Sequence, residues 1–168
     1  MNHDQVVCIG VGGAGTKILN TLAIEKLYDK KLCVINTDRE TLELSKVDNK
    51  ILIGEQTTKG QGSHSLPEVG AQAFAESYQS LVKLVEANEY YVIIGGLGGG
   101  TGTGAIPEFA KLLEAQGKNF VVIVTMPFAF EGFIRMNKAK TAIDKIKQHC
   151  KNLIIIKSES MDSVNYFV

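Results

Sequence analysis

The segment Gly95–Pro107 reads GGLGGGTGTGAIP, with seven glycines and two threonines in thirteen residues. It follows the apolar run Tyr91–Ile94, which is typical of a buried strand. Glycine weakens the interior of a strand or a helix by ~0.5–1 kcal/mol relative to alanine. A folded chain that gathers so many glycines after a strand therefore uses them where its backbone bends sharply or approaches a ligand closely.

Six short runs of β-forming residues alternate with helical patterns along the chain. Most of these runs are apolar throughout, as are strands that are buried on both faces of a parallel sheet. The expected strands are Val6–Ile9, Leu32–Asn36, Lys50–Ile53, Tyr91–Ile94, Phe120–Thr125 and Leu153–Ile156. The expected helices are Pro67–Asn88, Ala105–Gln116 and Glu131–Cys150. This alternation predicts an α/β fold with a doubly wound, mostly parallel sheet and helices on both faces.

Length and charge limit the possible classes of protein. One domain, residues 1–168, is expected because a chain of this length buries a sizeable core and shows no linker or repeat. Basic and acidic residues both number 18, so the net charge is zero, which argues against bulk electrostatic binding to nucleic acid or an anionic membrane. Six late lysines are expected to form the solvated face of a helix: Lys138, Lys140, Lys145, Lys147, Lys151 and Lys157.

The cysteines indicate the compartment. Cys8, Cys33 and Cys150 are widely spaced, and we expect reduced core thiols in a cytoplasmic protein. The histidines share no ligand spacing with the cysteines, so no metal site made of protein side chains is expected. No apolar run approaches the ~18 residues of a membrane-spanning helix, and the N-terminus does not resemble a signal peptide. Direct membrane insertion is therefore not expected.

The glycine-rich segment lies where ligands bind in such folds, beyond the carboxyl end of a parallel strand. Five of its glycines are expected to let the backbone take left-handed turns, so that its amides point inward at an anion: Gly98, Gly99, Gly100, Gly102 and Gly104. The positive end of the next helix dipole supports the same anion, and Thr101 and Thr103 can add hydroxyl donors. The segment therefore predicts a cradle for a diphosphate or triphosphate.

A second glycine-rich loop, CIGVGGAGTKILN, follows the first strand and contains Gly10, Gly12, Gly13 and Gly15. The spacing Gly10-x-Gly12-x-x-Gly15 also fits a dinucleotide fingerprint, and Asp38 ends the second strand where a ribose-binding acid would lie. An NAD-binding Rossmann oxidoreductase domain is thus an alternative. It leaves Gly98–Gly104 unexplained, whereas two facing loops suggest a ligand with more phosphate to hold.

Five segments resemble the tubulin/FtsZ family, and the agreement covers nearly the whole chain. GGLGGGTGTGAIP resembles the family's signature, and IGVGGAGTK resembles its first phosphate loop. VINTD at Val34–Asp38 resembles the second contact loop, and IGEQTTKGQGSHSLPEVG resembles the loop that senses the γ-phosphate. VTMPFAFEGFIRM resembles the segment that holds the ribose. The resemblance implies a Rossmann-like GTPase domain of an FtsZ-like cytoskeletal protein that polymerises into filaments in cell division or a related process.

The same resemblance implies GTP or GDP as ligand, with Mg²⁺ held through phosphates and water, and self-association with FtsZ-like subunits. By this resemblance Glu131 accepts from the ribose hydroxyls, and Arg135 lies beside the sugar and phosphates. The two are four residues apart, so a surface ion pair is the alternative. The full set of candidate binding residues is Gly12, Gly13, Ala14, Gly15, Lys17, Asn36, Asp38, Gly62, Ser63, Gly98, Gly99, Gly100, Thr101, Gly102, Thr103, Pro127, Glu131, Arg135 and Ser158.

Several positions depart from the family pattern. Lys17 stands where the family usually has a guanine-reading asparagine, and His64 and Leu66 replace a typical glycine and asparagine. Lys157 and Ser158 stand where the family usually has Pro-Asn. These departures keep open a third possibility, a non-hydrolysing FtsZ-like assembly or regulatory module.

The family's domain continues into a central helix and a second domain, whose acid activates water in the neighbouring subunit's site. The 168-residue chain contains no such acidic motif and is expected to lack that helix and domain. No catalytic residue is therefore assigned within the chain, and its own GTP hydrolysis is expected to be absent or very slow.

Overall fold

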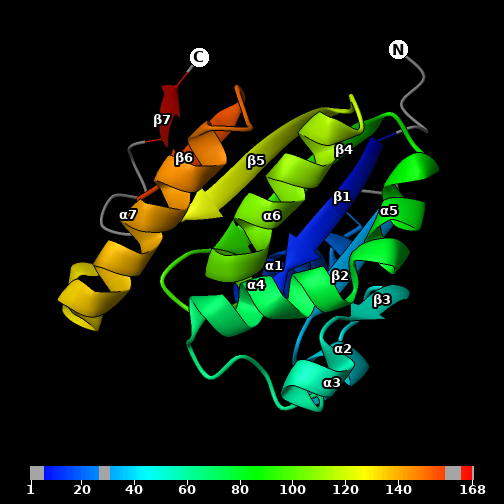
Figure 1. Ribbon diagram of the computed structural model, residues 1–168, viewed down its shortest axis with the longest axis horizontal. Helices are drawn as coiled ribbons and strands as arrows, with labels where there is room; N and C mark the ends of the chain where they lie inside the picture. Colours follow the sequence, from blue (N-terminus) through cyan, green and yellow to red (C-terminus); the bar gives the residue numbers. More distant parts are fainter. Residues whose placement is uncertain (1–5, 27–30, 158–163, 168) are drawn as a thin grey trace.

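The computed structural model describes residues 6–26, 31–157 and 164–167. Its centre is a seven-stranded sheet in the order β3-β2-β1-β4-β5-β6-β7 (Figure 1). The strands are β1 (Val6–Val11), β2 (Lys31–Asn36), β3 (Asn49–Leu52), β4 (Tyr90–Gly96), β5 (Asn119–Thr125), β6 (Leu153–Ile156) and β7 (Val164–Phe167). All neighbouring pairs from β3 to β6 are parallel, and β7 runs antiparallel to β6. The six predicted strands are confirmed, whereas β7 was not predicted.

Helices cover both faces of the sheet, as the sequence predicts. They are α1 (Gly12–Ile24), α2 (Arg39–Glu43), α3 (Glu55–Thr58), α4 (Pro67–Glu76), α5 (Tyr78–Glu86), α6 (Thr101–Ala115) and α7 (Phe133–Lys147), with a 3₁₀ turn η2 (Ala129–Glu131) before α7. The larger apolar cluster joins one face of the sheet to α4, α5, α6 and α7, and the smaller cluster joins the other face to α1 and α2. The doubly wound, mostly parallel α/β fold is therefore confirmed.

The predicted helix Pro67–Asn88 is wrong as a single helix, because the chain breaks at Ser77 into α4 and α5. The Ser77 hydroxyl accepts a hydrogen bond from the backbone N–H of Gly54, at 3.0 Å. A serine side chain that bonds to backbone outside its own helix is typical of a helix end. The apolar period still identifies the buried face, since Phe74, Leu81 and Val85 lie in the core.

The helix after the glycine-rich segment begins at Thr101, earlier than the expected Ala105. Of the five glycines expected in left-handed turns, only Gly98 has a positive φ, of 100°. Gly102 and Gly104 lie inside α6, where a Cβ would come within 2.5 Å of the Gly96 carbonyl oxygen and 2.0 Å of the Pro67 carbonyl oxygen, respectively. These two glycines are therefore required by close backbone contact rather than by turn geometry.

The third predicted helix, Glu131–Cys150, differs in the opposite sense, because α7 begins at Phe133, later than expected. Glu131 ends the turn η2, and Gly132 (φ 98°) separates it from α7. Because φ near +98° is costly for any residue with a side chain, the glycine marks the boundary that a smooth helical period would miss.

All three cysteines are buried, as expected of core cysteines. Burial raises the pKa of the Cys33 thiol to about 12, so this thiol stays protonated and unreactive at neutral pH. Within the described part of the chain, no helix is long and apolar enough to cross a membrane.

Replacing Gly104 by alanine should lower the free energy of unfolding by about 1–3 kcal/mol, because the added methyl group overlaps the Pro67 carbonyl. Gly13 is the matched control, since it also lies in a helix and a Cβ there meets no atom within 4 Å. We expect Gly13→Ala to change stability by less than about 0.5 kcal/mol. Urea unfolding followed by circular dichroism measures the free energy of unfolding of both variants. Equal changes in Gly104→Ala and Gly13→Ala would contradict the packing role of Gly104.

Candidate functional site

A cleft of about 690 Å³ opens at the carboxyl ends of β1, β4 and β5, the edge marked by the arrowheads of β1 and β5 in Figure 1. Ligands of open parallel sheets bind at such an edge. Its volume lies within the range of ~300–1,000 Å³ that is usual for binding pockets. Twelve of the candidate residues line it: Gly12, Gly13, Ala14, Lys17, Ser63, Gly99, Gly100, Thr101, Gly102, Pro127, Glu131 and Arg135.

The first turns of α1 and α6 both face this cleft, and neither is capped. No side chain accepts a hydrogen bond at either helix start, and neither first turn contains an acidic residue. The first four N–H groups of a helix have no acceptor within the helix, and the helix dipole adds partial positive charge there. Two such ends that line one cleft form a site for a multiply charged anion.

Glycine brings these two helix ends together. A Cβ on Gly12 would lie 3.1 Å from the backbone nitrogen of Gly102 and 3.3 Å from the Cβ of Thr101, and Gly12 also has a left-handed φ of 71°. At Gly13 and Gly99 a Cβ would meet no atom within 4 Å. These two glycines therefore leave open space in the cleft, which a ligand can occupy.

Three hydroxyl groups join the loops below the cleft. The Thr101 hydroxyl lies 2.7 Å from the Thr37 hydroxyl and 2.9 Å from the Ser63 hydroxyl, and all three residues are buried. This chain of hydrogen bonds ties the start of α6 to the segment after β2 and to the loop before α4. It fixes the position of Thr101 and Ser63, which both line the cleft.

Glu131 and Arg135 form the i,i+4 ion pair that was the alternative interpretation, and both side chains also line the cleft. Glu131 Oε1 accepts from the backbone N–H of Phe128 at 2.9 Å, and Oε2 accepts from the Arg135 guanidinium. The hydrogen bond from Phe128, with Arg135 as a further cause, holds the pKa of Glu131 below its usual range. Glu131 is therefore a charged acceptor at the mouth of the cleft at neutral pH.

Six candidate residues do not line the cleft, and their contacts show what they do instead. Asn36 Oδ1 accepts from the backbone N–H groups of Thr37 and Asp38, at 2.8 and 3.3 Å. Asp38 Oδ1 accepts from Thr41 N at 2.7 Å and caps α2. Hydrogen bonding from Thr41, through its side chain and then its backbone N–H, lowers the pKa of Asp38. The acid required by the dinucleotide-binding alternative is thus turned away from the cleft.

The other four are structural in the described site. A Cβ on Gly15 would lie 2.5 Å from the Ile94 carbonyl oxygen, so Gly15 allows α1 to pack on β4. Gly62 and Gly98 have left-handed φ angles of 82° and 100°. The Thr103 hydroxyl accepts from Gly98 N at 2.9 Å and so holds the bend of the loop. The last candidate, Ser158, lies outside the described residues.

Sequence reasoning missed seven residues that line the cleft: Val11, Ser65, Gly96, Leu97, Thr125, Met126 and Phe128. All lie inside the motifs that carry the family resemblance, so their position next to the candidate residues was the available signal. Among the residues that the structure describes, no group of three or more His, Cys, Asp or Glu side chains could hold a metal ion.

The loop before α4 contains two consecutive left-handed residues, His64 (φ 48°) and Ser65 (φ 60°). Such conformations cost about 1–3 kcal/mol each and persist only where neighbouring contacts hold them. One such contact comes from α7, where the Lys138 ammonium donates to the Ser65 carbonyl oxygen at 2.8 Å. His64 thus occupies a left-handed conformation, which is least costly for glycine.

Comparison with known proteins gives a consistent result. The model of the Tubulin/FtsZ family, GTPase domain, matches residues 5–165. "Cell division protein FtsZ 1" of Methanocaldococcus jannaschii is 36% identical over 157 residues, which are 94% of this chain and 43% of that protein. "Cell division protein FtsZ" of Aquifex aeolicus is 36% identical over 98% of this chain and 45% of that protein.

Solved structures agree with the sequence relatives. The empty FtsZ dimer of M. jannaschii superposes with a TM-score of 0.89 at 36% identity, over 94% of this chain and 46% of that one. The GDP-bound CetZ1 monomer of Haloferax volcanii, 23% identical, shares the fold with a TM-score of 0.83 over 95% of this chain and 53% of that one. The chain thus spans a little under half the length of these curated relatives.

The pKa of the Glu131 carboxyl tests the contacts described for this side chain at the mouth of the cleft. Because the charged form is favoured, its midpoint should lie below the ordinary value of a glutamate. Any stability this carboxylate contributes is then present above that ordinary value and lost as the pH falls through the lowered one. Carbon-13 NMR of the side chain measures the midpoint.

Arg135→Gln is the matched variant. We expect it to raise the Glu131 midpoint only partly, because the hydrogen bond from Phe128 N remains. An ordinary midpoint in the unaltered chain, or full recovery in the variant, would contradict the described contacts.

Proposed function

The chain belongs to the Tubulin/FtsZ family, and from this premise we propose that it is the GTP- and GDP-binding domain of a polymerising cytoskeletal GTPase. The observation that carries the proposal is the pair of uncapped helix N-termini, α1 and α6, which line one cleft. Because the chain spans under half of its relatives, polymerisation, hydrolysis and a role in cell division belong to the proposal. A cytoplasmic location is part of it too.

The phosphates of the nucleotide would bind the backbone N–H groups at the two helix starts. On the α1 side these belong to Gly12, Gly13 and Ala14, and on the α6 side to the segment Gly99–Gly102. The Thr101 hydroxyl, fixed by Thr37 and Ser63, adds a side-chain donor. Gly13 and Gly99 leave open space beside these N–H groups, which the phosphates would occupy.

The sugar would lie at the mouth of the cleft, beside Pro127, Glu131 and Arg135. Glu131 is charged at neutral pH and can accept from sugar hydroxyls, while Arg135 offers further N–H donors to phosphate. Asn36, Asp38 and Gly62 would act indirectly, by shaping the segments behind Thr37 and Ser63. Ser158 stays a candidate for the base.

Mg²⁺ would accompany a triphosphate and neutralise part of its charge. Among the residues that the structure describes, Glu131 is the one acid that lines the cleft, and its two oxygens already accept from Phe128 and Arg135. We therefore propose that the ion is held mainly by phosphate oxygens and water, as Mg²⁺ often is in nucleotide sites.

Hydrolysis requires a group that orients or activates water, and Glu131 is poorly suited because its carboxylate is occupied and its pKa is lowered. We propose that a second subunit supplies this acid when the full protein self-associates. The M. jannaschii FtsZ structure is that of a dimer, which supports self-association. A relative that binds nucleotide without turnover is the remaining alternative, because His64 and Leu66 lie in the loop that contacts the cleft.

Calorimetric titration of the purified, nucleotide-stripped chain with GTP, GDP, ATP and NAD in the presence of Mg²⁺ tests the proposal. We expect GTP and GDP to bind at least tenfold more tightly than ATP, and NAD to bind weakly or not at all. Tight NAD binding without GTP binding, or no binding of any nucleotide, would overturn it. Phosphate release from the isolated chain should be near background, while fast release would place the acid within the chain.

Gly99→Asp should weaken GTP and GDP binding by about tenfold or more, because the new carboxylate points into the phosphate cradle. Gly99→Asn is the matched control, with the same size and no charge, and should weaken binding much less. Since a Cβ at Gly99 has open space, both variants should keep the parent's unfolding midpoint. Equal losses for Asp and Asn would show that crowding rather than charge decides binding.

Lys17 lines the cleft at the position where the family usually has asparagine. An ammonium group only donates hydrogen bonds, whereas an amide both donates and accepts. We therefore expect Lys17→Asn to raise the ratio of the ATP to the GTP dissociation constant by at least threefold. An unchanged or reduced ratio, measured by the same titrations, would show that Lys17 does not influence base selectivity.

A further inference from the structure

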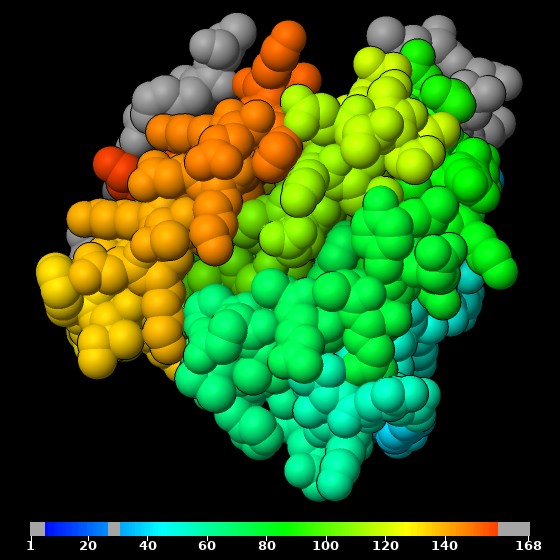
Figure 2. Space-filling view, in the orientation of Figure 1, coloured from blue at the N-terminus to red at the C-terminus, as the bar shows by residue number. Residues whose placement is uncertain are grey.

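A second hollow, separate from the nucleotide cleft, lies between α7 and the starts of α4 and α6. Its volume is about 390 Å³, and it shares no lining residue with the cleft. The lining residues are Pro67, Thr103, Phe133, Ile134, Asn137, Lys138, Thr141, Ala142 and Lys145. Figure 2 shows this face, where the side chains of α7, yellow to orange, border those of α4 and α6, in green. We call this hollow the α7 groove.

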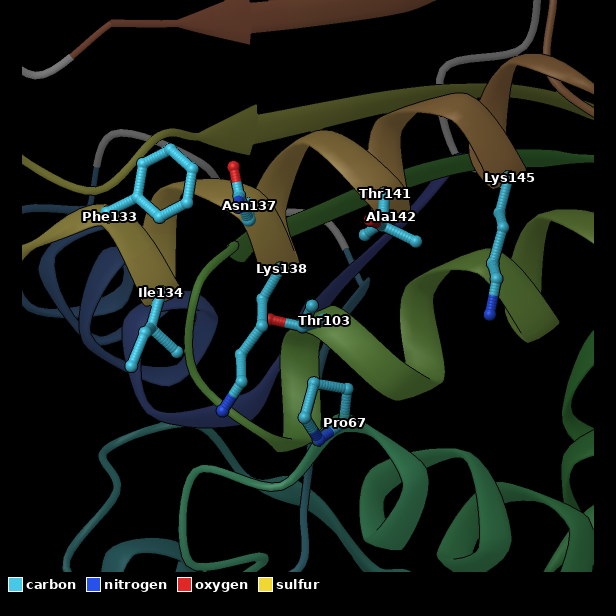
Figure 3. A pocket seen from close by; sticks show the side chains of 9 residues that line it. All are labelled: Pro67, Thr103, Phe133, Ile134, Asn137, Lys138, Thr141, Ala142 and Lys145. Carbon is cyan, nitrogen blue, oxygen red and sulfur yellow. The ribbon is translucent and has the colours of Figure 1, made fainter.

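One stripe of α7 forms the upper wall of the groove. Ile134, Lys138, Thr141 and Lys145 are spaced i, i+4, i+7 and i+11, which places them on one side of a helix. Figure 3 shows Ile134, Lys138 and Lys145 extending from α7 toward α4 and α6. At a rise of 1.5 Å per residue, the stripe is ~17 Å long. This length suits about three helical turns or five extended residues of a bound segment.

The two ends of the groove differ in chemistry. At the start of α7, Phe133 is 77% exposed and Ile134 is 70% exposed, and both line the groove together with Pro67. Large apolar side chains that are exposed next to one another often mark an interaction surface. The other end is cationic, with Lys138 and Lys145.

The positive charge of the groove is not balanced locally. None of its nine lining residues is acidic, and the one acid of α7, Asp144, is not among them. Among the residues that the structure describes, the Lys145 ammonium makes no hydrogen bond or ion pair. Lys138 uses one donor on the Ser65 carbonyl oxygen and retains two others. The sequence expectation of a merely solvated lysine face is therefore incomplete, because Lys138 is half-buried and bonded.

We propose that the α7 groove docks a short acidic amphipathic segment of a partner protein. Its apolar side chains would pack on Ile134, Phe133 and Pro67, and its carboxylates would pair with Lys138 and Lys145. This is the helix-in-groove mode of recognition, with charge complementarity that selects the partner and its direction. The hollow shape favours a protein segment over an anionic membrane, which needs a protruding apolar face.

Fluorescence anisotropy with a labelled fourteen-residue peptide tests the proposal. The probe has leucines four residues apart and glutamates between them, and its control has glutamine in place of each glutamate. We expect the glutamate peptide to bind with micromolar affinity and the glutamine peptide at least fivefold more weakly. No binding of the glutamate peptide, or equal binding of both, would overturn the proposal.

Variants locate the binding. Lys145→Glu and Ile134→Ser should each weaken the peptide at least fivefold, while Lys151→Glu, an exposed lysine outside the groove, should change it less than twofold. GTP binding by the Lys145→Glu chain should equal the parent, which separates failure of this proposal from failure of the nucleotide site. Equal effects of Lys145→Glu and Lys151→Glu would overturn the groove as the site. The proposal would also be overturned if anionic vesicles containing phosphatidylserine bound the chain through Lys145 and displaced the peptide.

Discussion

Backbone-to-backbone contact around the first turn of α6 is the constraint on which the rest of the structure depends. Gly102 packs against the end of β4, and Gly104 packs against the start of α4 at Pro67, both at distances that exclude any Cβ. Gly12 completes the set by bringing the start of α1 to the same turn. The glycines thus set the positions of three helices relative to the sheet, and the cleft exists because those helices begin there.

The chemistry of the cleft follows from this placement. Two helix starts without side-chain caps or acidic first-turn residues direct N–H groups and partial positive charge into one space. A helix end without a partner is costly when it is buried, so the arrangement is best satisfied by an anionic ligand. The hydroxyl chain from Thr37 through Thr101 to Ser63 then couples that ligand's surroundings to the loop before α4.

Six strands, the helices on both faces of the sheet and most residues that line the cleft could be predicted from sequence, because the apolar period and the family motifs are local signals. The break at Ser77 could not, since it depends on a hydrogen bond to Gly54, 23 positions away. Asn36 and Asp38 were placed at the ligand, but each binds nearby backbone instead. The α7 lysines looked uniform in sequence, whereas the neighbouring helices divide them into groove-facing and outward positions.

We propose that the starts of α1 and α6 form one anion site. A two-dimensional amide NMR titration of the labelled chain with GDP, and with inorganic pyrophosphate as the minimal anion, tests this site residue by residue. We expect amides of Gly12–Ala14 and of Gly99–Gly102 to shift together, along curves with one dissociation constant for each ligand. Shifts confined to one of the two segments, two separate constants, or no shift with GDP would contradict it.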